Sequence, residues 1–323
     1  MVKFNLVFLL LATASVASAA QPVHDDSVLI KKIVFAAHQT NYIGTFIYQS
    51  GSYVETSRIT HIFDGENEHE RLVGLDGERS EVIRKNGQVW CYLGDSKVMV
   101  AKRDSARTFP ALLPEQLSLL QKNYLTRPGE DDRVAGFPAH SLVFQPKDKM
   151  RYTHKMWADS NSGLLLKAVV LDERDHIIEQ YAFAQLDIGG DIDRKWIVKS
   201  TRSDQSAASD TAISQSTHPV PNESGWMVYA LPAGFKKITE VTRSLRNNHL
   251  PVTHLAYSDG LAGISVFIEK LGDKAGLKTG LYSKGAIQVY TKVLGTNLLT
   301  VVGEVPPRTV MQVAESVRFG GKD

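Results

Sequence analysis

Short strand-like segments recur about every ten residues between Tyr42 and Gln185, and this spacing constrains the fold more than any other feature. The clearest signal is Asn86-Gly87, because both residues tolerate the positive φ of a type I′ turn and apolar strand-like runs flank them. Many short strands joined by turns predict an antiparallel meander that curves into a partly closed barrel. The expected strands lie at 43–48, 53–59, 81–85, 88–93, 97–101, 139–145, 152–158, 164–172 and 177–185.

Two segments in the same region have helical rather than strand-like patterns. Residues 27–39 carry apolar side chains at helical spacing, and the acidic pair Asp25-Asp26 suits the positive end of a helix. Pro114 fits the first turn of a second helix, which continues through leucines to Tyr124. Helices lying in the concavity of a curved sheet can leave an apolar cavity. The sequence leaves open whether side chains fill it.

A polar segment divides the chain into two domains. Residues 203–222 contain almost no large apolar side chains, so they cannot offset their ordering entropy and are interpreted as a linker. The N-terminal domain is expected at 21–202 and the C-terminal domain at 223–319. The latter contains hairpins around Ser258-Asp-Gly260 and Gly295-Thr-Asn297, followed by a helix at 309–317. The predicted fold class is therefore α+β in both domains.

The first twenty residues have the pattern of a secretory signal peptide. Lys3 gives a positive start, an apolar run follows, and Ala17-Ser-Ala19 supplies the small residues of a cleavage site. The run is too short to span a bilayer, which takes about 20 apolar residues. Cleavage near Ala19 or Ala20 would release an exported protein. Export argues against nucleotide-driven chemistry and against nucleic acid as a partner.

Charge is distributed unequally between the two halves of the chain. Residues 20–223 contain 24 Lys and Arg against 28 Asp and Glu, whereas residues 224–323 contain 12 against 7. A basic C-terminal domain attracts acidic partners or anionic lipid headgroups, although a drift of mixed surface charge would look the same. The basic residues expected to steer a partner are Lys236, Lys237, Arg243 and Arg246.

The sequence carries no dense catalytic or metal-binding motif. It lacks the Gly-x-Ser-x-Gly elbow of hydrolases and the His-Glu-x-x-His pattern of zinc enzymes. His61 and the acidic segment Glu66–Glu70 are interpreted as part of a solvated turn between strands. The single cysteine, Cys91, cannot form an internal disulfide and is expected to be buried. No enzyme activity, cofactor or metal is therefore predicted, although dispersed histidines leave a spatially assembled hydrolase as an alternative.

Aromatic residues are the more informative side chains of the N-terminal domain. Most aromatic rings fill a core, but in a half-open barrel some of them could line a site for acyl chains. The candidates for such a lining are Phe46, Tyr48, Trp90, Tyr92, Trp157 and Phe183.

Several strings, in order along nearly the whole expected mature chain, resemble the RseB/MucB family. In the N-terminal half they are Tyr42-Ile-Gly-Thr-Phe-Ile-Tyr48, Glu70-Arg-Leu-Val-Gly-Leu-Asp-Gly77, Glu81-Val-Ile-Arg84, Trp90-Cys-Tyr92 and Phe109-Pro-Ala-Leu-Leu113. In the C-terminal half they are Tyr257-Ser-Asp-Gly-Leu-Ala262, Ser265-Val-Phe-Ile-Glu269 and Val301-Val-Gly-Glu-Val-Pro-Pro307.

The resemblance implies a periplasmic regulator of an envelope-stress sigma factor. Such proteins bind the periplasmic region of a membrane-spanning anti-sigma factor of the RseA/MucA type, protect it from proteolysis, and release it on binding lipid or lipopolysaccharide. The resemblance also implies an N-terminal half-open barrel like the LolA/LolB lipoprotein carriers and a partner-binding C-terminal domain. Tyr257 and Asp259 are then candidate partner contacts or simply parts of a hairpin turn. A lipid or lipoprotein carrier without an anti-sigma partner is the alternative, and the sequence leaves open whether the chain forms a homodimer.

Overall fold

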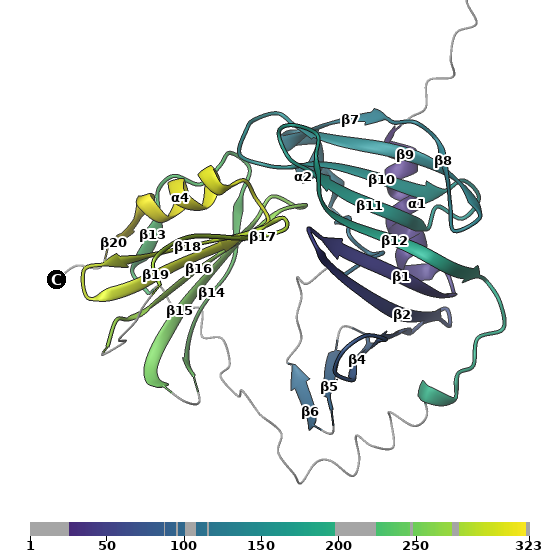
Figure 1. Ribbon diagram of the computed structural model, residues 1–323, viewed down its shortest axis with the longest axis horizontal. Helices are drawn as coiled ribbons and strands as arrows, with labels where there is room; N and C mark the ends of the chain where they lie inside the picture. Colours follow the sequence, from purple (N-terminus) through teal and green to yellow (C-terminus); the bar gives the residue numbers. More distant parts are fainter. Residues whose placement is uncertain are drawn as a thin grey trace, which may run out of the picture.

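The computed structural model describes residues 26–86, 88–94, 96–100, 108–114, 116–197, 224–245, 248–272 and 278–320. Of residues 96–100, 243–245 and 248–250 only the backbone is described. The expected signal peptide and the expected linker at 203–222 lie outside these residues. The described residues form two large β-sheets, each with its own apolar core, and one two-stranded ribbon (Figure 1).

The N-terminal part is one antiparallel sheet of twelve strands. Its strands pair in the order β6-β5-β4-β3-β2-β1-β12-β11-β10-β9-β7, and β8 pairs with β9. The two ends of this order, β6 and β7, are far apart, so the curved sheet is a half-open rather than a closed barrel. The strands are β1 (Tyr42–Ser50), β2 (Tyr53–Phe63), β3 (Glu68–Gly74), β4 (Ser80–Lys85), β5 (Gln88–Leu93), β6 (Ser96–Val100), β7 (Tyr124–Pro128), β8 (Asp132–Val134), β9 (Phe137–Pro146), β10 (Thr153–Asp159), β11 (Leu165–Leu171) and β12 (Ile177–Ile188).

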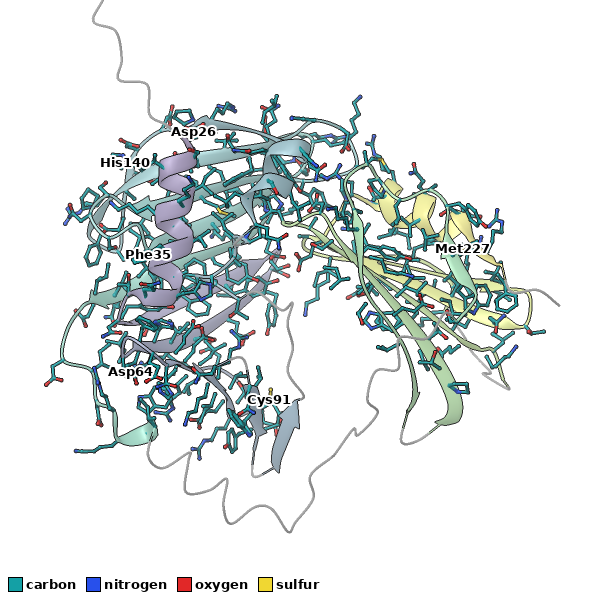
Figure 2. The ribbon with its side chains drawn as sticks, turned by 180° about the vertical axis from the view of Figure 1, so that it is seen from behind. Asp26, Phe35, Asp64, Cys91, His140 and Met227 are labelled. Carbon is teal, nitrogen blue, oxygen red and sulfur yellow. The ribbon has the colours of Figure 1, made fainter. Side chains whose placement is uncertain are left out.

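Two helices accompany this sheet near their predicted places, but the second begins three residues after Pro114, so Pro114 is not in its first turn as expected. Helix α1 (Asp26–Gln39) lies across one face of the sheet and buries Ile30, Ile33 and Ala37 against it (Figure 2). Those residues recur every three or four positions, so they share one side of the helix. Helix α2 (Leu117–Asn123) follows Pro114 and leads directly into β7. Among the described helices none is long and apolar enough to cross a membrane.

The strand pair β1–β12 needs a glycine at one point. A Cβ on Gly44 would lie 2.7 Å from Cε1 of Phe183 and 2.8 Å from the carbonyl oxygen of Gln185. The register between these strands shifts at the adjacent pair Thr45/Phe46, where Ala184 of β12 is the extra residue without a partner on β1. The absence of a side chain at Gly44 therefore lets the Phe183 ring pack directly on the backbone.

The interpretation of Glu66–Glu70 as part of a solvated turn is wrong for its second half. Glu68–Gly74 forms β3, an interior strand between β2 and β4. His61, His69 and Glu70 are buried, with 0%, 6% and 6% of their surface exposed. The buried carboxylate of Glu70 is paired across the strands with Arg84 at 2.8 Å. Cys91 on β5, expected to be buried, is only half-buried.

The C-terminal part is a six-stranded antiparallel sheet with one helix. Its order is β14-β15-β16-β19-β18-β17, and α4 (Pro307–Ser316) packs on one face through Val310, Val313 and Ala314 (Figure 1). A separate two-stranded ribbon pairs β13 (Trp226–Val228) with β20 (Val317–Phe319). The remaining strands are β14 (Lys236–Leu245), β15 (Asn248–Ser258), β16 (Gly263–Lys270), β17 (Gly280–Lys284), β18 (Ile287–Leu294) and β19 (Asn297–Gly303).

Candidate functional site: the aromatic interior and the domain junction

Five aromatic rings meet inside the N-terminal half-barrel. Phe46 and Tyr48 on β1 face Phe183 and Tyr181 on β12, with ring centroids 6.0 Å apart for Phe46–Phe183 and 4.7 Å for Tyr48–Tyr181. Phe109 packs among them at 5.1 Å from Phe46 and 5.0 Å from Phe183, and it stacks on Tyr181 at 5.6 Å. This cluster is apolar at its centre, so its rings can pack against another apolar group, such as an acyl chain, in place of one another.

The predicted cavity residues do not all join this cluster. Phe46, Tyr48 and Phe183 lie in it, whereas Trp90 and Tyr92 are on β5, four strands away from β1. Strands are spaced by about 4.8 Å, so the two groups are on the order of 20 Å apart. Trp157 is buried elsewhere, with the ammonium groups of Lys155 and Lys167 at 4.7 and 4.6 Å from its ring centroid.

Phe109 is the central residue that sequence reasoning missed. Its ring is only 2% exposed, and Leu113 and Leu120 from the same stretch of chain are also buried in the core. The string Phe109–Leu113 was noted only as part of a family resemblance, because an aromatic outside a strand gives no periodic signal. The interior of the half-barrel is therefore filled, at least in part, by the chain's own side chains.

A polar network closes the interior where α1 meets β2 and β3. Glu68 Oε1 lies 3.0 Å from both His38 Nδ1 and His61 Nε2. Burial raises the pKa of Glu68, but the hydrogen bonds from the two histidines outweigh this effect and hold the pKa at about 2. His61 Nδ1 lies 2.8 Å from the carbonyl oxygen of Thr40, so both ring nitrogens of His61 face acceptors. The network thus ties the C-terminal end of α1 to the sheet.

Glu70 continues this network toward the aromatic interior. Arg84 donates from Nη1 to Glu70 Oε1 at 2.8 Å and also to Thr108 Oγ1. Burial raises the pKa of Glu70, and the guanidinium of Arg84 opposes that effect. Thr108 directly precedes Phe109, so this pair anchors the start of the stretch that fills the half-barrel.

The two domains meet at Asp259, which is fully buried. Its Oδ1 accepts from the backbone N–H groups of Leu261 and Ala262 at 2.9 and 2.8 Å, which forms the expected Asp-Gly turn. Its Oδ2 accepts from Tyr124 Oη at 3.0 Å and from Arg151 Nε at 2.5 Å, and both of these donors belong to the N-terminal domain. One carboxylate therefore shapes its own turn and holds the other domain.

Arg151 is surrounded mainly by the C-terminal domain. Its side chain is 1% exposed, and besides Asp259 it donates to Ala233 O and to Asp148 Oδ2. Its guanidinium carbon lies 5.0 Å from the centroid of the Phe235 ring. A buried charge is tolerated only where its donors find acceptors, and here all three donating nitrogens have one.

A second set of contacts joins the domains around the β17–β18 turn and α4. Gln288 Nε2 donates to Tyr152 Oη at 3.2 Å, and Thr309 Oγ1 donates to Met150 O at 3.0 Å. Arg308 forms an exposed ion pair with Glu173. The junction therefore fixes the relative position of the domains at two separate places.

The predicted partner-contact residues fall into three groups. Tyr257 and Asp259 are buried, 7% and 0% exposed, so neither is available to a partner in this arrangement. Lys236 and Lys237 are exposed at the start of the edge strand β14, and Lys237 forms an ion pair with Glu240 at 2.7 Å. The side chains of Arg243 and Arg246 lie outside the described residues.

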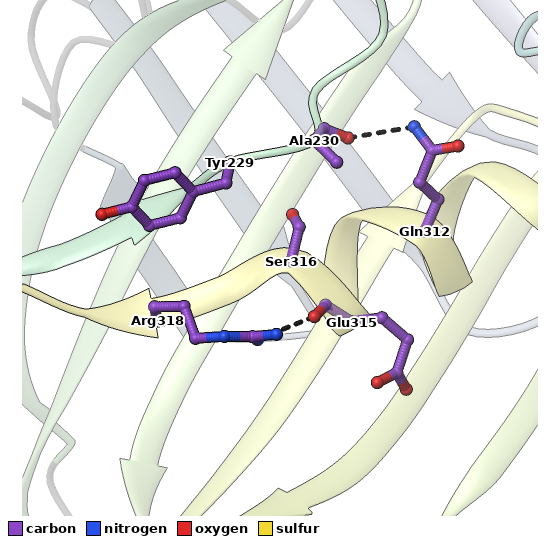
Figure 3. A pocket seen from close by; sticks show the side chains of 6 residues that line it. All are labelled: Tyr229, Ala230, Gln312, Glu315, Ser316 and Arg318. Atoms are coloured by element: carbon purple, nitrogen blue, oxygen red, sulfur yellow. Dashed lines mark hydrogen bonds between the residues drawn. The ribbon is translucent and has the colours of Figure 1, made fainter.

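An open hollow of about 630 Å³ lies between the end of β13 and helix α4 (Figure 3). Gln312 Nε2 donates to Ala230 O at 3.2 Å on one side, and Arg318 Nη1 donates to Glu315 O at 2.7 Å on the other. The ring of Tyr229 is 66% exposed beside it. The sequence had given no indication of this hollow. Its lining residues are Tyr229, Ala230, Gln312, Glu315, Ser316 and Arg318.

Among the described residues no group of three or more His, Cys, Asp or Glu side chains is placed to hold a metal ion. The fold defines a two-domain protein built mainly from antiparallel sheets, with two separate apolar cores. The chain belongs to the MucB/RseB family: the family's N-terminal domain matches residues 25–201 and its C-terminal domain matches residues 220–318. Members of this family are regulatory proteins and not enzymes.

Named relatives and solved structures agree with this assignment. The chain is 31% identical to the sigma factor AlgU regulatory protein MucB of Pseudomonas aeruginosa, over 96% of both chains. It is 26% identical to the sigma-E factor regulatory protein RseB of Haemophilus influenzae, over 98% of both. A crystal structure of MucB in complex with MucA(peri) superposes with a TM-score of 0.70 at 29% identity, covering 92% of this chain and all of that one. A crystal structure of MucB alone gives a TM-score of 0.65 at 29% identity, covering 92% of this chain and 98% of that one.

Proposed function

We propose that this protein is a periplasmic negative regulator of an envelope-stress sigma factor. It binds the periplasmic region of a membrane-spanning anti-sigma factor of the MucA type and protects that region from regulated proteolysis. The observation that carries the proposal is the likeness of both domains, over 92% of the chain, to MucB in complex with MucA(peri). The signal-peptide pattern at residues 1–20 supports export to the compartment where such a partner resides.

Lipid is the proposed signal that releases the anti-sigma factor. The support is the cluster of Phe46, Phe109, Tyr181 and Phe183, because these rings form an apolar interior in a sheet with two open ends. A lipid or a lipopolysaccharide fragment would insert an acyl chain there. Release requires that the lipid-bound protein prefers an arrangement with lower affinity for the anti-sigma factor, since a ligand shifts only populations that it binds unequally.

Long-range attraction to the partner is assigned to the basic C-terminal domain. Lys236 and Lys237 lie exposed at the edge of its sheet, and the charge of residues 224–323 sums to +5. Rim charges of this kind act mainly on association rates and on their salt dependence. Arg243 and Arg246, in the same strand region of the sequence, are proposed to contribute to the same field.

Calorimetric titration of the mature chain with the periplasmic region of its cognate anti-sigma factor tests the proposal. Binding at micromolar concentration or tighter, weakened by lipopolysaccharide fragments, is the expected result. Tight binding that lipid leaves unchanged would support the regulator and exclude lipid as its signal. Absence of binding together with lipid uptake would favour a lipid or lipoprotein carrier. A protease-protection assay on the anti-sigma region separates binding from protection.

A further inference from the structure

One stretch of chain contacts both the interior of the half-barrel and the C-terminal domain. We define the plug segment as residues 108–114 together with residues 116–124. On its inner side Phe109 packs among the aromatic rings of β1 and β12, and Leu113 and Leu120 are 4% and 1% exposed in the same core. From residue 108 to residue 116 the described residues form neither helix nor strand. Side-chain packing rather than a ladder of backbone hydrogen bonds therefore holds this part in place.

The outer side of the plug segment carries the turn around Asp259. Gly260 lies against Leu119, Pro114 and Leu120, at 3.3 to 3.8 Å from the position that a Cβ would occupy. Tyr124 donates its hydroxyl to Asp259, and Asn123 donates its side-chain amide to the Asp259 carbonyl at 3.5 Å. Leu261 packs against the N-terminal core itself. The turn Ser258–Ala262 therefore sits directly on the residues that fill the half-barrel.

We propose that the plug segment couples the acyl-chain site to the docking of the C-terminal domain. In the arrangement described, Phe109, Leu113 and Leu120 occupy the volume that an acyl chain would take. An acyl chain entering the half-barrel displaces them, and the shift of Leu119, Asn123 and Tyr124 removes the surface on which the Asp259 turn docks. This inference rests on the proposed lipid signal and assigns the residues that transmit it.

Physical chemistry makes the exchange feasible. The acyl chain buries its own apolar surface in the interior, and this gain offsets the exposure of the side chains that it displaces. On undocking, Asp259 and Arg151 regain water, which limits the cost of separating them. Thermodynamic linkage also makes the coupling reciprocal: if acyl binding undocks the domains, undocking must strengthen acyl binding by the same factor.

Gly234 offers a substitution at the contact between the C-terminal domain and the plug segment. Its Cβ would lie 2.0 Å from Asn123 Oδ1, and Asn123 is buried and hydrogen-bonded to the Leu119 carbonyl, so it has little room to move. Gly234→Ala should therefore disfavour the docked arrangement. The residue has φ +85°, and the strain of alanine there is the same whether the domains are docked or not. Gly295→Ala is the matched control, because its φ is +58° and nothing lies within 4 Å of its Cβ position.

The experiment titrates a dansyl-labelled fatty acid into the mature wild-type chain and both variants, with circular dichroism to verify folding. Gly234→Ala should bind the probe with an affinity at least about fivefold higher than that of wild type, since fivefold is the lower end of usual allosteric coupling. Gly295→Ala should have the affinity of wild type. Equal affinities in all three proteins would overturn the coupling while leaving lipid binding intact. If none binds the probe, the proposed lipid signal fails and the coupling fails with it. Asp259→Asn, which weakens docking by a different route, must shift the affinity in the same direction.

Discussion

The buried pair Arg151–Asp259 should be the strongest single polar link between the domains. Asp259→Asn tests it with the least change of shape. The amide oxygen can still accept from the backbone N–H groups of Leu261 and Ala262, so the turn is retained. What is lost is the negative charge that faces Arg151 Nε and Tyr124 Oη.

The size of the expected loss of stability in Asp259→Asn follows from the burial of the two side chains. The side chains of Arg151 and Asp259 are 1% and 0% exposed, so water cannot replace the missing charge while the domains stay docked. Removing one partner of such a pair costs about 3–5 kcal/mol, because the other charge is left buried without compensation. Arg151 keeps Asp148, whose side chain is 33% exposed, so the expected loss is at the lower end, about 3 kcal/mol.

A double-mutant cycle in urea provides the assay. Asp259→Asn, Arg151→Met and the double variant are unfolded in urea, and the coupling energy is expected to reach about 2 kcal/mol. Trp226 is the only tryptophan of residues 224–323, so its emission reports the C-terminal domain when the three tryptophans of the N-terminal half are replaced by phenylalanine. Breaking the pair should separate the two unfolding transitions. Lys237→Ala is the control: it breaks an ion pair whose lysine is 52% exposed and should cost less than about 1 kcal/mol.

A coupling energy below about 0.5 kcal/mol would refute this reasoning, because residues in direct contact within one network normally couple by more than that. The reasoning would also be refuted if Asp259→Asn and Lys237→Ala lowered the free energy of unfolding by the same amount. Either result would mean that the domains are not held together by this carboxylate.

Three further predictions concern the interior, the pH dependence and the steering charges. Phe109→Ala should destabilise the N-terminal domain by about 3 kcal/mol in urea unfolding, since it empties a buried ring site, and a loss below about 1 kcal/mol would contradict the packing. Burial lowers the pKa of His154 from 6.5 to about 4, and Asp259 partly opposes this. Folding therefore favours the neutral ring, and about 3 kcal/mol of stability present above pH 6.5 should be lost as the pH falls to 4. His154→Phe should flatten the unfolding free energy over that range, and an unchanged slope would exclude this residue as its source. Reversing Lys236 and Lys237 to Glu should slow association with the anti-sigma region and weaken its salt dependence in stopped-flow measurements, and unchanged rates at low salt would remove the steering role.

Local chemistry made much of the fold predictable. Strands β4 and β5 pair as a hairpin within one residue of the predicted bounds, and α1 begins one residue before its predicted start. These elements depend on turn and periodicity signals that a few neighbouring residues carry. Strand β3 was missed because Glu66–Glu70 looked like part of a solvated turn. The charges on β3 are compensated across strands, by Arg84 for Glu70 and by Glu81 for Arg71, and a linear sequence does not display such pairs.

The candidate site was predictable only in part for the same reason. Phe46, Tyr48 and Phe183 come together because β1 and β12 pair, but the sequence alone does not say which strands close a meander. Asp259 was recognised as a turn residue, and it does form a turn. Its second role depends on Arg151, which is 108 positions away, and no spacing rule links them.

The polar character of the junction is itself an argument for reversible docking. Replacing a buried ion pair by apolar groups of similar volume often leaves stability unchanged or raises it, so Arg151–Asp259 is not the most stable way to join two domains. It is, however, selective: Arg151 finds Asp148, Ala233 O and Asp259 together in this arrangement. A shift of the C-terminal domain by a few ångströms would take Asp259 and the Ala233 carbonyl away from a guanidinium that is still buried and would leave it only Asp148, which costs more than a sliding apolar contact. Full separation returns these groups to water. A junction built this way penalises intermediate arrangements and permits the two end states, which is what a ligand-operated switch requires.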